Sequence, residues 1–153
     1  MTDKTTVVEQ LVPLFVANFM GGTIKGRTRL QKLVFLSQHT GRSELGVDYE
    51  FGRGWYGPFS NKLGRVVDDL VSMGLLTEKL SSTSSGRRVI EYGLTRQGRS
   101  ILRTAGRSFI TGKSRTRIQE VCKDYGSMTF MALLERVHNE YPEYVLKNPW
   151  KLK

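Results

Sequence analysis

Apolar residues recur every three or four positions in several stretches of the chain, the spacing of one buried helical face. The first stretch begins at Thr5 or Thr6, whose hydroxyl can cap a helix, and ends near Met20. The same spacing and its flanking stop signals predict further helices over residues 28–39, 58–73, 96–109, 114–125 and 128–140. In the helix over 28–39, the pattern puts Arg29 and Lys32 on the outside.

Two strands follow the third helix. Residues 75–81 and 87–94 are predicted strands, joined by a flexible polar turn over 82–86. A short strand is also expected at 49–51. The fold class is therefore mostly α with a small β-hairpin (α+β).

Three helices followed by a hairpin and a helix is the order of a winged helix-turn-helix. The recognition helix would span about 58–73 and the wing about 75–95. The winged-helix domain is expected over 5–110, and 111–153 form a helical C-terminal extension. An apolar stripe in that extension predicts a dimerisation or packing element, made of Phe130, Leu133, Leu134 and Val137.

Charge points to the class of partner. The chain has 24 Lys and Arg against 14 Asp and Glu, a net charge of +10 at pH 7. Such an excess favours a polyanion. No apolar run approaches the roughly 18–20 residues that cross a bilayer, and the first residues do not resemble a signal peptide. With Cys122 as the single cysteine, the interpretation is a cytoplasmic protein with no membrane partner.

Polar residues at the front of the predicted third helix are the first candidate nucleic-acid contacts. Asn61 and Arg65 suit base edges, whereas Ser60 and Lys62 suit phosphates. The alternative is an ordinary solvated helix face.

A second group of candidates lies in and after the wing, where Glu91 is the only acid between residues 87 and 117. Arg87 and Arg88 follow the turn and are expected to contact phosphates. Further arginines share one face of the next helix at spacings of three and four, either as phosphate contacts or as a solubilising face: Arg96, Arg99, Arg103 and Arg107.

Aromatic residues gather between the second and third helices. They interleave with glycines and are expected to pack on the core rather than to stack bases of a single strand: Tyr49, Phe51, Trp55, Tyr56 and Phe59.

Several segments resemble known families. Residues 69–76 (DLVSMGLL) and 92–99 (YGLTRQGR) resemble the recognition-helix end and the wing exit of MarR-like and PadR-like regulators. Residues 29–36 (RLQKLVFL), 56–60 (YGPFS) and 137–144 (VHNEYPEY) look like the SocA/Panacea and YwgA-type prokaryotic group. The resemblance implies a winged-helix fold, although the dense arginines after the wing depart from the SocA-like pattern.

Chemistry-bearing residues are sparse. His39 and His138 are far apart, one cysteine gives no zinc spacing, and no phosphate-loop motif occurs. His39 is expected to cap a helix and Cys122 to be a small buried apolar residue. We therefore expect no enzyme, no metal and no cofactor, and no motif specifies a small-molecule effector.

The sequence favours a transcriptional regulator that binds double-stranded DNA. Many such regulators bind a two-fold site as a homodimer, and a homodimer is the arrangement considered for this chain. Two alternatives remain open. One is a winged-helix module that binds protein, such as an antitoxin-like or polymerase-associated adaptor. The other is a binder of single-stranded DNA or RNA.

Overall fold

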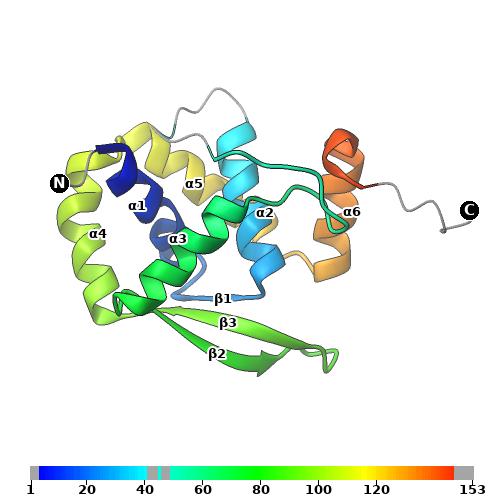
Figure 1. Ribbon diagram of the computed structural model, residues 1–153, viewed down its shortest axis with the longest axis horizontal. Coiled ribbons are helices and arrows are strands. Elements are labelled where there is room, and N and C mark those ends of the chain that lie inside the picture. Colours follow the sequence, from blue (N-terminus) through cyan, green and yellow to red (C-terminus); the bar gives the residue numbers. More distant parts are fainter. Residues whose placement is uncertain (1–3, 41–44, 46–48, 147–153) are drawn as a thin grey trace, which may run out of the picture.

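The computed structural model describes residues 4–40, 45 and 49–146 (Figure 1). Their fold is mostly helical with one small antiparallel sheet, which confirms the predicted α+β class. The elements in chain order are α1 (Lys4–Phe19), β1 (Thr23–Lys25), α2 (Arg27–His39), α3 (Asn61–Ser72), β2 (Leu76–Ser82), β3 (Arg88–Leu94), α4 (Arg96–Phe109), α5 (Gly112–Tyr125), α6 (Phe130–Glu140) and the 3-10 turn η1 (Pro142–Tyr144). No described helix is both long and apolar enough to cross a membrane.

The sheet has the order β1-β3-β2, with both neighbours antiparallel to the central strand. β2 and β3 form the predicted hairpin, in register from Leu76 opposite Leu94 to Ser82 opposite Arg88. Its turn uses Gly86 at φ +85°, a conformation that glycine adopts without strain. The hairpin projects below the helices in Figure 1, so its turn is remote from α4.

α1 is the central helix of the core and packs against α2, α3, α4 and α5. Val12 of α1 and Leu33 of α2 are fully buried, and Ile118 and Val121 of α5 join the same apolar cluster. α5 was assigned to the C-terminal extension from the sequence, yet its apolar face covers α1 and α2 as part of this one core.

The apolar stripe of α6 folds back onto α2. Leu133 and Val137 are buried in the common core, and Phe35 of α2 lies among rings from α2 itself, from the loop before α3 and from the C-terminal part of the chain. The Phe35 ring stacks on His39 at 4.2 Å between centroids and meets three further rings edge-on, those of Phe51, Tyr141 and Tyr144. The stripe is thus covered within the chain.

Two predicted helix starts were too early. α3 begins at Asn61 rather than at 58, because Ser60 is the residue whose side chain caps it. α6 begins at Phe130 rather than at 128, because Thr129 is the residue whose side chain accepts the capping bond from the Ala132 N–H. α4 begins at Arg96, as predicted, and the Thr95 hydroxyl caps it by accepting from the Gly98 N–H.

The strand expected at 49–51 does not form. Gly52 instead pairs with Phe59 in an isolated antiparallel bridge, which closes a loop and leaves Tyr49 and Phe51 as irregular chain packed on α2.

The prediction that Arg29 and Lys32 lie on the outside of α2 is also wrong, because other segments of the chain cover them. Lys32 is 2% exposed, and its ammonium donates to the Pro58 carbonyl at 3.2 Å. Arg29 is partly buried and donates to the carbonyls of Gly126 and Met128, which connect α5 to α6. The loop before α3 and the α5–α6 connection therefore enclose α2 on the sides that its own periodicity leaves open.

Candidate nucleic-acid interface

Ser60 holds the start of α3 from inside the protein and is not on its outer face. Its hydroxyl accepts from the Leu63 N–H at 3.1 Å, and its side chain is fully buried. The Gln31 amide also bonds both the N–H and the carbonyl of Ser60, each at 2.9 Å. The residue predicted as a phosphate contact is thus a buried anchor that fixes where α3 begins.

Charge is divided along the exposed face of α3. Lys62 and Arg65 lie in its first half, and Asp68 and Asp69 in its second half. This order opposes the helix dipole, which favours acids at the N-terminus and cations at the C-terminus. Lys62 forms an ion pair with the largely buried Glu9 of α1. Of the contacts predicted on α3, Asn61 and Arg65 are exposed, and no ion pair is found for Arg65 among the described residues.

A hollow of about 290 Å³ separates α3 from the start of α2 and from β3. Asn61 and Arg65 line its α3 side, and Arg27 lines the opposite side. The Arg27 Nε donates to the Tyr92 hydroxyl at 3.1 Å, and this bond raises the pKa of Arg27. Asp68 also lines the hollow, and Glu78 lies 3.8 Å from Arg27, so acids mark its far edge.

Arg27 was not predicted as a contact, although the sequence around it carries a signal of such a role. An arginine directly after a glycine at the start of a helix opposes the helix dipole, as the cations of α3 do. Such a placement is stabilised by an anion from outside the helix.

A second hollow, of about 250 Å³, lies between the hairpin and the start of α6. Arg87 and Arg88 line it together with Arg27, which therefore belongs to both hollows. The Arg87 guanidinium sits 3.5 Å from the centroid of the Phe130 ring, a cation–π contact that joins hairpin and α6. A basic track thus runs from the first half of α3, over Arg27, to the hairpin.

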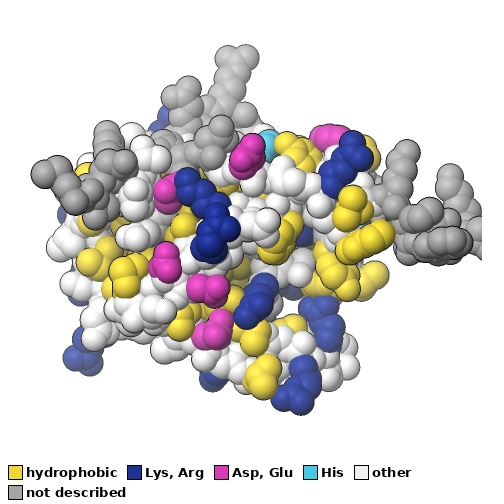
Figure 2. Space-filling view, in the orientation of Figure 1, with side chains coloured by type: hydrophobic (Ala, Val, Ile, Leu, Met, Phe, Trp, Pro, Cys, Tyr) yellow, Lys and Arg dark blue, Asp and Glu magenta, His cyan; other side chains and the backbone are white. Residues whose placement is uncertain are grey.

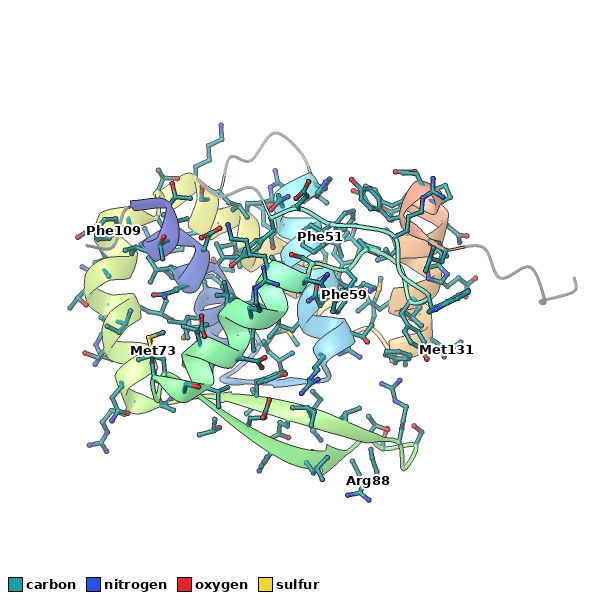
Figure 3. The ribbon with its side chains drawn as sticks, in the orientation of Figure 1. Phe51, Phe59, Met73, Arg88, Phe109 and Met131 are labelled. Carbon is teal, nitrogen blue, oxygen red and sulfur yellow. The ribbon has the colours of Figure 1, made fainter. Side chains whose placement is uncertain are left out.

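Figure 2 shows basic side chains over α3 and over the hairpin on one face, with acidic side chains gathered beside α3. Part of the hairpin's charge is neutralised within the hairpin, because Lys79 lies 3.3 Å from Glu91. Arg88, which Figure 3 labels near the free end of the hairpin, points away from the body of the protein.

The arginine stripe of α4 lies elsewhere. α4 begins where the hairpin joins the body, and Figure 1 shows it at the opposite side from the hairpin turn. Arg96 and Arg103 are exposed there, and the Arg99 guanidinium donates to the Leu94 carbonyl at 3.1 Å. The stripe is separate from the track that ends at Arg87 and Arg88.

The aromatic loop divides into packed and exposed residues. Tyr49 is buried with its hydroxyl donating to the Glu9 carbonyl, and Phe51 packs on Phe35, as core packing predicts. Trp55, Tyr56 and Phe59 are instead exposed. The bridge between Gly52 and Phe59 closes a loop that leaves Trp55 and Tyr56 on its outer side, which periodicity cannot reveal.

His39 and Cys122 are the two residues predicted to have structural rather than catalytic roles. His39 is the last residue of α2, and its Nδ1 lies 3.1 Å from the Phe35 carbonyl. Burial raises the pKa of the Cys122 thiol to about 12, which keeps it protonated and apolar. No group of three or more His, Cys, Asp or Glu residues suited to a metal occurs in the described part of the chain.

No family model matches this chain, and a search of curated proteins finds none that is significantly similar.

Proposed function

We propose that the protein is a winged-helix protein that binds double-stranded DNA. The order of elements supports this, since two helices flank β1 and a third precedes a hairpin whose second strand pairs with β1. In such a fold α3 enters the major groove and the β2–β3 hairpin is the wing.

The observation that carries the proposal is the pair of adjoining hollows between α3 and the wing. They share Arg27 and are lined by further arginines from α3 and from the hairpin, namely Arg65, Arg87 and Arg88. Guanidinium groups suit phosphates and guanine edges, and the Asn61 amide suits adenine. Asp68 and Asp69 repel phosphates, so the contact is confined to the first half of α3.

The role that follows is regulation of transcription by binding, in the cytoplasm and without chemistry. A homodimer would place two copies of α3 on successive major grooves. The second candidate, a protein-interaction module, is favoured by exposed apolar side chains, those of Trp55, Met131 and Phe59, the last of which lines the first hollow.

Salt dependence is the first test. If the four arginines of the track each neutralise one phosphate, the logarithm of the duplex association constant should fall against the logarithm of salt concentration with a slope of about −3.6. Fluorescence anisotropy with a labelled mixed-sequence duplex, between 50 and 200 mM salt, should show a loss of affinity of about a hundredfold. Absence of duplex binding at the lowest salt would transfer support to the protein-interaction module.

Two exposed arginines separate the wing from α4. Replacing Arg88 by alanine should make the salt slope shallower by about one unit, because one phosphate contact is lost. Arg103→Ala is the matched control, since Arg103 is equally an exposed arginine but lies on α4. Both variants should keep the melting temperature of the parent. A change with Arg103→Ala and none with Arg88→Ala would place the DNA on α4 instead.

A further inference from the structure

Three side chains form a ladder where the wing meets α6. The Tyr56 ring lies 6.3 Å from the Phe130 ring between centroids, tilted by 59°, and the Arg87 guanidinium covers Phe130 at 3.5 Å. Tyr56 remains 58% exposed. Arg87 and Phe130 hold each other, so the surface of the ladder that is open to a visiting planar group is that of Tyr56.

The hollow beside this ladder is strongly cationic. Among the described residues that line it are Arg27, Arg87 and Arg88, together with the hydroxyl-bearing Thr28, and none of the lining residues carries a carboxylate. Arg29 lies close behind, and after burial the charge of Arg87 is the next cause that lowers the pKa of Arg29. Cations held this close together repel one another, and an anion in the hollow relieves that repulsion.

The backbone adds to this preference. Gly26 precedes α2 and has no side chain to cap its first N–H groups, which point to the same end of the helix as Arg27 and Thr28. The arginines and the ring remain the main determinants, because they combine a charge for a phosphate with a flat surface for a base.

We propose that this hollow binds a single unpaired nucleotide through its 5′-phosphate, with the phosphate on Arg27 and Arg87 and the base stacked on Tyr56. The volume of about 250 Å³ is below the usual range of about 300–1,000 Å³ for whole-ligand pockets. It therefore takes the phosphate and sugar, while the base lies outside on the exposed ring. The nucleotide is either free or the 5′ end of a single-stranded overhang, and duplex binding is not required for either.

Tyr56→Ala is the decisive variant, and Trp55→Ala is its matched control. The two neighbouring side chains are exposed to almost the same extent, 58% and 57%, but of these two only Tyr56 lines the hollow. The probes are AMP, a 5′-phosphorylated tetra-deoxyadenylate, the same tetranucleotide without its 5′-phosphate, and a blunt duplex.

The parent protein should bind AMP, the phosphorylated tetranucleotide or both. Its affinity for the tetranucleotide should fall when the 5′-phosphate is removed. Tyr56→Ala should lower the affinity for the phosphorylated probe by about 5- to 150-fold, the equivalent of one stacked base. Trp55→Ala should leave this affinity unchanged. Blunt-duplex affinity and the melting temperature should stay the same in both variants, which separates this site from the proposed function.

The two sources of the nucleotide are distinguished by the probes. Binding of AMP with the same dependence on Tyr56 assigns a free nucleotide, whereas binding of the phosphorylated tetranucleotide without AMP assigns a strand end. The proposal is overturned if the parent binds neither AMP nor the phosphorylated tetranucleotide. It is also overturned if removal of the 5′-phosphate leaves the affinity for the tetranucleotide unchanged, or if Tyr56→Ala and Trp55→Ala have the same affinities.

Discussion

A chain truncated after Ser127 is expected to lose its cooperative unfolding transition. Truncation removes α6 and η1, and with them the buried side chains of Leu133, Leu134 and Val137. Their burial contributes on the order of 5 kcal/mol, comparable with the total stability of about 5–15 kcal/mol typical of a domain. It also exposes Phe35, which is fully buried among rings of the C-terminal part. Circular dichroism during thermal and urea unfolding measures the effect.

Point variants on α6 supply the control. Leu133→Ala should cost about 2–5 kcal/mol because Leu133 is buried, whereas Met131→Ala should cost less than about 0.5 kcal/mol because Met131 is 70% exposed. A truncated chain that unfolds cooperatively but no longer self-associates in sedimentation would return α6 to the dimerisation role that its stripe also suggests.

Replacing Lys32 by methionine is expected to stabilise the protein at pH 7 and not at pH 10. Burial lowers the pKa of Lys32 from 10.5 to about 8. Between these values the unfolded chain binds more protons than the native one, so stability rises with pH across this window. Below pH 8 both states are protonated, and the full destabilisation of about 3 kcal/mol is present. Methionine keeps the apolar length, but loses a hydrogen bond to Pro58 worth about 1 kcal/mol.

Urea unfolding at pH 7 and pH 10 tests this as a difference between parent and variant. Taking the difference in the free energy of unfolding between the two proteins cancels the contributions of other titrating groups. One such group is the Cys122 thiol, whose raised pKa lowers stability at high pH in both proteins. Lys25→Met, which removes an exposed lysine of β1, should change the free energy of unfolding by less than about 0.5 kcal/mol at either pH. A Lys32 variant that is less stable than the parent at both pH values would show that the bond to Pro58 outweighs the buried charge.

Tertiary contacts explain why two predicted surface positions are buried. Ser60 and Lys32 are polar, and a helix read alone puts such residues in water. In the structure they meet through the loop before α3, where Gln31 and Lys32 bond the backbone of Ser60 and Pro58. Gly57 lies at φ +98° in this loop, and a Cβ there would stand 3.2 Å from the Lys32 Cε. Residues 29–36 and 56–60 therefore form a single packing unit.

What the sequence by itself determined is local. The helices over 27–39 and 96–109 and the β2–β3 hairpin were predictable within a residue or two, because apolar periodicity, capping hydroxyls and turn glycines act between near neighbours. The excess of positive charge was equally plain. Only the tertiary structure decided where that charge gathers, because Arg27, Arg65 and Arg87 come from three elements that meet in space.

The same reason applies to β1 and to α6. A strand of three residues has no periodicity of its own, and β1 exists because β3 offers it a free edge. The stripe of α6 is as consistent with a second copy of the chain as with α2, and the packing of Leu133 and Val137 on the common core decides between them. Spacing along a chain specifies which face of an element is apolar, whereas the surface that covers that face depends on distant residues.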